Sequence, residues 1–202
     1  MTETEIMTDA GDDQKGHSPF QAMAEHIRDS GAAMVLACDV VRGEIEVKVN
    51  ASDVAAALAL FRDDRQAAFT QLIDLTAVDY PDRKYRFDMI YQMLSMQNNM
   101  RLRLVAAVGE GQAVPSATSV FLAANWAERE VWDMFGIFFK DHKDLRRILN
   151  NYGFNGYPLR KDFALTGYVG VRYDDCDKYI LSESIELSQS NLEFIHTKTP
   201  WR

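Results

Sequence analysis

The feature that most constrains the fold is a strict alternation of apolar and polar side chains over residues 85–93. In a strand, residues two apart share one face, so this pattern predicts a strand with one buried face. A Gln-Asn-Asn turn at 97–99 follows, and leucines then alternate with arginines over 101–104. The two segments predict an antiparallel hairpin. The apolar face of its first strand carries Tyr85, Phe87, Met89, Tyr91 and Met93.

A second hairpin is predicted earlier in the chain. Residues 33–39 form an apolar run typical of a buried strand, and residues 44–49 alternate with Ile45, Val47 and Val49 on one face. The Val-Arg-Gly sequence at 41–43 supplies the turn between them.

Helical spacing predicts the remaining elements. A helix is expected over 18–30, with Ser18 as N-cap and proline at its first position, and another over 52–61 after Ser52. A short helix is expected over 69–73, then a brief strand over 75–79. The strongest helix is predicted over 119–136, where glycine ends it. Together these elements predict an α+β fold, a mainly antiparallel sheet with flanking helices.

The chain is expected to divide into three parts. Residues 1–17 are polar and acidic and predict a disordered tail, followed by an α+β domain over 18–149. From 150 to 202 we expect a long extended C-terminal arm that wraps a partner, because glycines and a proline interrupt every apolar period. The interrupting residues are Gly153, Gly156, Pro158, Gly167 and Gly170.

Composition excludes several classes of protein. The longest uncharged apolar stretch, 54–61, is too short to cross a bilayer, and the acidic N-terminus predicts neither a secretory signal nor a transit peptide. Two cysteines cannot hold an iron–sulfur cluster, and the four histidines are far apart. The sequence Gly109-x-Gly111 lacks the third glycine of a phosphate loop. We therefore expect no cofactor or metal on this chain, with Cys38 a buried, inert thiol.

Charge is unevenly distributed along the chain. The net charge is −8, and residues 1–100 carry all of it, with 9 basic and 17 acidic side chains against 13 of each in 101–202. The second half contains a basic cluster over 140–161. Because the acidic remainder would repel nucleic acid, a protein partner with an acidic groove suits the cluster better.

The densest constellation of charged residues lies around Glu128, Glu130, Asp133 and His142. A stand-alone hydrolase using Glu130, Asp133 and His142 is one interpretation. However, Glu128 and Glu130 diverge on a helix, whereas Arg129 and Asp133 are spaced to pair along its surface. Flanking aromatics favour a third interpretation, a protein–protein interface. These candidate anchors are Trp126, Trp132, Phe138 and Phe139.

Two blocks of this region resemble a known family. The sequence WAEREVWDMFGIFF at 126–139 with the following His142 and DLRR at 144–147, and YGFNGYPLRKDFALTGY at 152–168, are similar to the signature of the 30 kDa subunit of respiratory complex I (NADH-quinone oxidoreductase). The chain departs from the family pattern at Tyr157, Ala164, Gly170 and Ser184. The resemblance implies interface roles for Trp126, Glu128, Arg129, Glu130, Asp133, Gly136, His142, Asp144, Arg146, Arg147, Gly153, Phe154, Pro158, Arg160, Lys161, Asp162, Gly167 and Tyr168.

The resemblance also implies a function. Such a subunit has no catalytic centre and holds no flavin, iron–sulfur cluster or quinone. It docks beside the 49 kDa-type subunit and neighbouring Fe–S subunits, within a proton-pumping complex that passes electrons from NADH through FMN and Fe–S clusters to quinone. The implied location is the cytoplasmic side of the bacterial inner membrane, peripheral to it, or else the matrix side of the mitochondrial inner membrane. The equivalent subunit of a membrane-bound hydrogenase is the alternative.

Overall fold

A five-stranded sheet forms the centre of the computed structural model, which describes residues 18–185. The strand order is β1-β2-β5-β4-β3, and every neighbouring pair is antiparallel except β2 and β5, which are parallel. The predicted α+β class with a mainly antiparallel sheet is therefore confirmed. The strands are β1 (Val35–Val41), β2 (Glu44–Asn50), β3 (Gln71–Asp79), β4 (Phe87–Ser95) and β5 (Met100–Val108).

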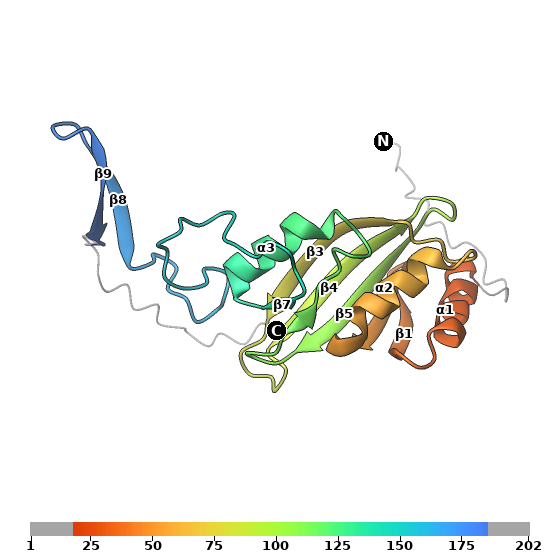
Figure 1. The fold of residues 1–202 in the computed structure, drawn as a ribbon. Coiled ribbons are helices and arrows are strands. Elements are labelled where there is room, and N and C mark those ends of the chain that lie inside the picture. Colours follow the sequence, from red (N-terminus) through yellow and green to blue (C-terminus); the bar gives the residue numbers. More distant parts are fainter. Residues whose placement is uncertain (1–17, 186–202) are drawn as a thin grey trace, which may run out of the picture.

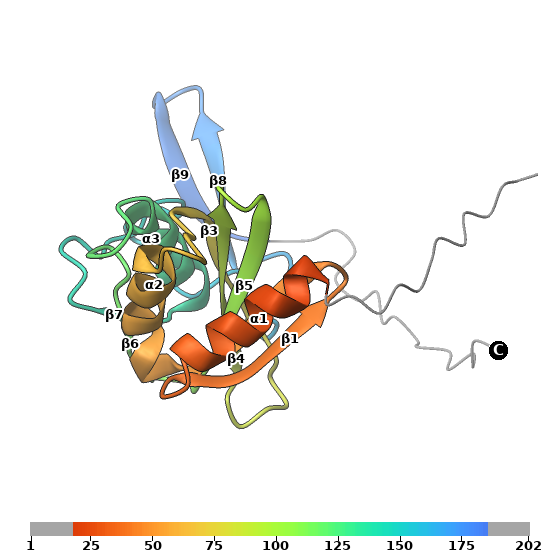
Figure 2. The same ribbon diagram turned by 90° about the vertical axis from the view of Figure 1, so that its right-hand side faces the viewer.

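One face of the sheet carries the core, as the alternation predicts. In the middle of the sheet Leu104 is opposite both Val47 and Tyr91, and all three side chains are fully buried. Three helices cover this face (Figure 1; Figure 2 shows the same layer from the side). They are α1 (Pro19–Ser30), α2 (Val54–Asp63) and α3 (Ala124–Phe135).

Both predicted hairpin turns are present. Arg42 and Gly43 both have positive φ, 52° and 77°, which suits a two-residue turn between twisted strands. Asn99 is also left-handed, with φ 50°. Its neighbour Asn98 donates from Nδ2 to the carbonyl of Gln66 at 2.6 Å, which holds the β4–β5 turn against the loop before β3.

Three predicted helices need correction. The short helix over 69–73 is wrong: Phe69 is fully buried, its N–H bonds to the carbonyl of Phe61 at 3.0 Å, and β3 begins at Gln71. Pairing with β4 overrides the local pattern there. The strongest helix begins at Ala124, five residues later than predicted, but ends at Gly136 as predicted, with φ 76°. The helix predicted from Ser52 begins at Val54, after a 3-10 turn over Ala51–Asp53.

Helix α1 and strand β1 are joined around Cys38. Arg28 donates to the carbonyl of Cys38, and the Cys38 thiol donates to the carbonyl of Ala24 at 3.4 Å. Burial raises the pKa of the Cys38 thiol, although Arg28 opposes the shift. A buried thiol with a raised pKa agrees with the predicted inert cysteine.

Beyond α3 the chain becomes irregular. A short parallel pair joins β6 (Val114–Pro115) to β7 (Phe139–Lys140), and no helix or strand is present from 141 to 168. A hairpin of β8 (Val169–Asp174) and β9 (Tyr179–Ser184) then stands clear of the domain (Figure 1). The predicted acidic tail 1–17 and the last part of the predicted arm lie outside the described residues. Within 18–185 no helix has the length and apolar content to cross a membrane.

The buried Tyr91 hydroxyl gives a test of this core. Among the described residues it has no hydrogen-bond partner, and burial raises its pKa. Tyr91→Phe should therefore raise the free energy of unfolding by about 1 kcal/mol, since an unsatisfied buried hydroxyl is removed. Urea unfolding measures it, with Tyr85→Phe as the half-exposed control. A loss of stability in Tyr91→Phe would contradict this packing.

Candidate functional site

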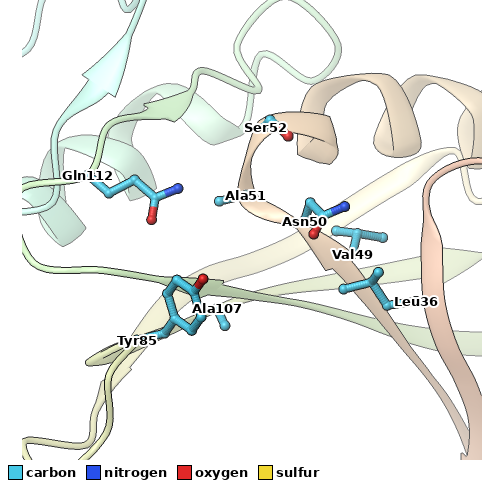
Figure 3. A pocket seen from close by; sticks show the side chains of 8 residues that line it. All are labelled: Leu36, Val49, Asn50, Ala51, Ser52, Tyr85, Ala107 and Gln112. Atoms are coloured by element: carbon cyan, nitrogen blue, oxygen red, sulfur yellow. The ribbon is translucent and has the colours of Figure 1, made fainter.

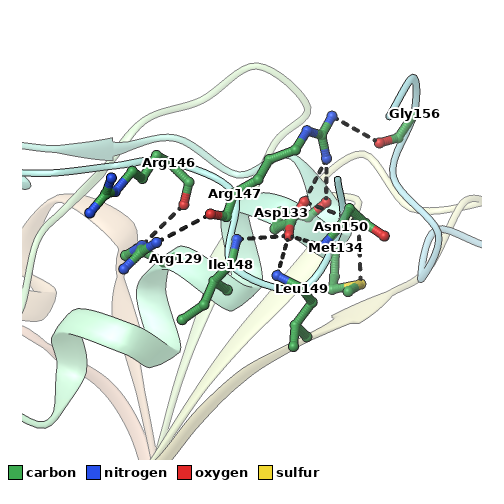
Figure 4. Close-up of polar contacts among 9 residues, drawn as sticks. All are labelled: Arg129, Asp133, Met134, Arg146, Arg147, Ile148, Leu149, Asn150 and Gly156. Atoms are coloured by element: carbon green, nitrogen blue, oxygen red, sulfur yellow. Dashed lines mark hydrogen bonds and ion pairs between the residues drawn. The ribbon is translucent and has the colours of Figure 1, made fainter. Parts of the chain in front are cut away.

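Asp133 on α3 is the centre of the most highly bonded group in the region with the family-like signature (Figure 4). Its side chain is fully buried. Oδ2 accepts hydrogen bonds from three consecutive backbone N–H groups, those of Ile148, Leu149 and Asn150, at 3.0, 2.9 and 2.9 Å. Oδ1 accepts from Arg147 at 2.6 Å and from the Asn150 amide at 3.0 Å. One carboxylate thereby fixes the first residues of the arm to α3.

These bonds determine the charge of Asp133. Burial alone would raise its pKa, but the hydrogen bonds from Asn150, Arg147 and Leu149 together hold the pKa well below its ordinary value. The carboxylate is therefore ionised at neutral pH, and with five donors around it has no free position for a substrate proton. Its role is structural.

Arg147 extends this group into the arm. NH2 donates to the carbonyl of Gly156 at 3.3 Å, and the guanidinium lies 5.8 Å from the ring centroids of Trp132, Phe154 and Tyr157. An arginine paired with a carboxylate and surrounded by aromatic rings is stabilised by both charge and cation–π attraction.

The predicted pair of Arg129 with Asp133 is wrong. Arg129 instead donates to the carbonyls of Arg146 and Arg147, both at 3.1 Å. Asp133 was also predicted to be at the surface, whereas it is buried beneath the same loop. Helical spacing shows which residues are neighbours on a helix, but not that a loop returns to cover them.

A second group of charges fastens the arm to the sheet. Arg86 holds the buried Asp79 with two bonds, of 2.7 and 2.9 Å, and also pairs with Asp162 of the arm at 3.0 Å. Asp79 in turn accepts from the backbone N–H of Lys161 at 2.8 Å. Arg160 donates to the carbonyl of Phe135 and to Glu110. Arg86 is the main reason that the pKa of Asp79 is lowered despite burial.

Two glycines permit this close packing. A Cβ on Gly136, where φ is 76°, would lie 2.6 Å from the Tyr157 ring and 2.8 Å from Arg160. A Cβ on Gly156, where φ is 119°, would lie 2.6 Å from the Phe163 ring. Both positions require glycine for conformation and for space.

Glu128 is the second buried carboxylate of α3. Oε1 accepts from the backbone N–H of Ala117 at 2.6 Å, and Oε2 accepts from the Ser116 hydroxyl at 2.7 Å. The Nε2 atom of His142 lies 3.9 Å from Oε2, and the two side chains are 1% and 0% exposed. Burial raises the pKa of Glu128, against the opposing effects of Ser116, Ala117 and His142.

The bonds of His142 define its tautomer. Nδ1 accepts from the backbone N–H of Asp144 at 3.1 Å, so in the neutral ring the proton is on Nε2, which faces the carbonyl of Asn125 at 3.2 Å. Both nitrogens are engaged, and Glu130 is on the exposed side of the helix. The structure does not bring Glu130, Asp133 and His142 together as a solvent-facing acid–base set.

The exposed part of this region is apolar and basic. Trp126 is 70% exposed on α3, and Phe138, which follows the helix, is 55% exposed. Trp132 and Phe139, the other two predicted anchors, are half-buried and buried, so their rings belong to the packing. Lys140, Lys143 and Arg146 are exposed; Arg146 pairs with Asp144 at 3.0 Å.

The signature residues thus divide by burial, and the interface role of the set stays a prediction. Exposed members are Trp126, Glu130, Asp144, Arg146, Gly153, Lys161, Asp162 and Tyr168. Partly buried members are Arg129, Gly136, His142, Arg147, Phe154, Pro158, Arg160 and Gly167, and fully buried members are Glu128 and Asp133.

A hollow at the ends of β2 and β5 is the other candidate site (Figure 3). It has a volume of about 290 Å³. Its polar side chains are engaged locally: Asn50 and Ser52 both donate to Asp53, and Gln112 accepts from the N–H of Gly109. The hollow therefore offers no convergent polar groups for a ligand. Over 18–185, no three His, Cys, Asp or Glu side chains are grouped to hold a metal ion.

Comparison with known proteins gives one consistent family. The model of the family described as "Respiratory-chain NADH dehydrogenase, 30 Kd subunit" matches residues 47–169. The protein named as the C-type subunit of NADH-quinone oxidoreductase in Parvibaculum lavamentivorans is 49% identical over 181 residues, and its namesake in Agrobacterium fabrum is 45% identical, each match covering 89% of both chains.

A solved structure supports the fold alone. A chain of the membrane-bound sulfane sulfur reductase, an archaeal respiratory membrane complex, is similar with a TM-score of 0.62 and 22% identity. The match covers 72% of this chain and 85% of that one.

Removing the Asp133 charge should release the start of the arm. In Asp133→Asn the amide presents a donor toward Arg147 and can no longer serve all five bonds, so backbone amides of 146–163 should exchange hydrogen on the order of tenfold faster. Exchange in β4 and β5 should not change. Asp144→Asn, at an exposed ion pair, is the matched control. Equal protection of 146–163 in both variants would contradict the assigned role of Asp133.

Glu128 should give the protein a measurable pH dependence. A carboxyl whose folded pKa is raised stabilises the fold fully below its unfolded pKa of about 4.3, and this contribution is lost as the pH rises through the folded pKa. The stability of the native protein relative to Glu128→Gln should therefore fall as the pH rises from 4 to 8. Urea unfolding at each pH measures the difference, and a constant difference would contradict it. Glu128→Ala should lose about 2–4 kcal/mol at every pH, because the Ser116 and Ala117 donors lose their acceptor.

Proposed function

The chain belongs to the family of the 30 kDa subunit of the respiratory-chain NADH dehydrogenase, and from this premise we propose that it is a structural, non-catalytic subunit in the peripheral arm of NADH-quinone oxidoreductase. The relatives at 45–49% identity all carry the name of the same NADH-quinone oxidoreductase component. In the proposed complex, FMN and Fe–S clusters on other subunits carry electrons from NADH to quinone.

The enclosed carboxylates of α3 carry the proposal that this chain is structural. Asp133 and Glu128, the acidic groups best placed for chemistry, are fully buried and bonded to backbone and side-chain donors. Their bonds build the base of the arm and the loop before α3. A family signature whose charges are used to shape the chain favours a role in assembly.

The proposed partner surface follows from what these bonds leave exposed. Trp126 and Phe138 near α3 and the basic side chains Lys140, Lys143 and Arg146 face solvent. Aromatic residues and arginine contribute strongly to protein–protein binding. We assign this surface to the 49 kDa-type subunit, with neighbouring Fe–S subunits along the arm.

The proposed location follows from the complex. In a bacterium the chain would be bound on the cytoplasmic side of the inner membrane through its partners, and in a mitochondrion on the matrix side. The absence of a membrane-spanning helix in 18–185 is consistent with attachment through other subunits.

The second candidate is the equivalent subunit of a related membrane complex such as a hydrogenase. The fold shared with a chain of the sulfane sulfur reductase complex keeps it open. The 49% identity to a relative named for NADH-quinone oxidoreductase, against 22% for that chain, favours the first assignment.

Purification of the tagged chain from native membranes in mild detergent separates these candidates. We expect it to bring down flavin- and Fe–S-containing chains that oxidise NADH with a quinone acceptor. Co-purification with hydrogenase chains would support the alternative. A monomer that hydrolyses a substrate by itself would refute the structural role.

Trp126→Ala should lower the amount of assembled complex on the order of tenfold, because a central exposed tryptophan would lose its contact with the partner. The matched control is Leu36→Ala, since Leu36 is 65% exposed on β1, at the opposite edge of the sheet from β3 and α3. Assembled complex is measured by flavin content in the purified membranes. Quinone reduction per flavin should be unchanged in both variants, and full assembly with lost turnover would indicate a catalytic role.

A further inference from the structure

The β8–β9 hairpin has two chemically different faces. Cross-strand partners share a face, and the register pairs Val169 with Ser184, Val171 with Ser182, and Tyr173 with Ile180. This apolar face therefore consists of four large apolar side chains and two small hydroxyl residues. The opposite face pairs Gly170 with Glu183, Arg172 with Leu181, and Asp174 with Tyr179, and contains the ion pair of Arg172 with Glu183 at 3.4 Å.

The apolar face is open in the described part of the chain. Val169, Val171, Tyr173 and Ile180 are 64%, 66%, 55% and 68% exposed. The hairpin stands away from the domain (Figure 1), and no element of 18–185 packs on these side chains. A two-stranded hairpin is at best marginally stable in water without a cover on its apolar side. The contrast between the two faces indicates which side the cover would occupy.

Charge at the hairpin tip limits what that cover can be. The turn carries Asp174, Asp175 and Asp177 against Lys178 alone, a net charge of −2. Such a tip is repelled by an anionic lipid surface and attracted by basic side chains. The cover therefore has an apolar patch with cationic groups next to it, at the position of the tip.

The size of the face argues against a pair of identical chains held by the hairpin alone. Four side chains cannot bury the ~1,200 Å² or more that a specific interface needs. The apolar face is, however, continuous in sequence with the exposed side chains of Leu165 and Tyr168, at 104% and 66%. A contact that begins on these residues and runs along the hairpin reaches a larger area on a single partner.

We infer that the apolar face of the β8–β9 hairpin binds a neighbouring protein subunit through an apolar patch bordered by basic residues, while the Arg172–Glu183 face remains in solvent. This inference rests on the proposed function, since it assigns one surface of this chain within the complex. It makes Ile180 a contact residue and its neighbour Leu181 a residue of the opposite face.

Photo-crosslinking in native membranes tests the inference directly. A photoreactive residue replaces Ile180 in one sample and Leu181 in the other, and the crosslinked chain is identified by mass spectrometry. We expect position 180 to label another subunit of the oxidoreductase at least about fivefold more than position 181. Equal labelling from both positions, or labelling from 180 of lipid, of a second copy or of the same chain, would overturn the inference.

A pair of substitutions gives the functional counterpart. Ile180→Ser removes an exposed side chain, whereas Leu181→Ser, in the same strand, removes a half-buried one that contributes more to the hairpin itself. Only Ile180→Ser should lower the assembled complex, severalfold, and Asp175→Lys combined with Asp177→Lys should lower it as well. If the native chain co-purifies with the oxidoreductase but Ile180→Ser and the double variant both assemble normally, the hairpin inference fails and the proposed function stands. If the native chain does not co-purify, the proposed function itself fails.

Discussion

The arrangement of the arm depends on one buried carboxylate. Residues 148–150 have no strand or helix partner, so their backbone N–H groups would be unsatisfied beneath the loop without Asp133. Asp133 accepts from all three and is compensated by Arg147, which in turn bonds Gly156. Because each bond satisfies a group that another bond has buried, these residues form one interdependent unit. The same carboxylate would be costly if it were buried without them.

The charges of the second half of the chain have two distinct uses. Those near the sheet, Asp79 with Arg86 and Arg160 with Glu110, connect the arm to strands far away in sequence. Those on the outer surface, such as Lys140 and Lys143, remain available for contacts with other molecules. A net charge of zero in this half therefore conceals an inner set that is internally paired and an outer set that is largely basic.

The sequence predicts the sheet better than it predicts the arm. Alternation at 85–93 and 44–49 correctly identifies both hairpins, because half-buried strands have a period of two that survives in any context. The helix at 69–73 fails, since a short apolar run near Phe69 takes the structure of its neighbours. The Arg129–Asp133 pair fails for a different reason: the donors to Asp133 are mostly backbone groups, which have no sequence signature. The family resemblance identified the right residues, but gave no indication that Glu128 and Asp133 are buried while Glu130 is exposed.

The parallel pairing of β2 with β5 has a consequence for the folding kinetics of the domain. The β1–β2 hairpin and the β3–β4–β5 meander each consist of antiparallel neighbours that are close in sequence, so either can form locally. The parallel seam joins them across residues 51–99, and closing a loop of that length carries an entropic cost before any contact repays it. Sheets with such non-local pairings fold slowly compared with helical bundles. The two halves of the sheet would therefore exist transiently with open edges at β2 and β5, where the nascent chain is most exposed to mispairing with other strands.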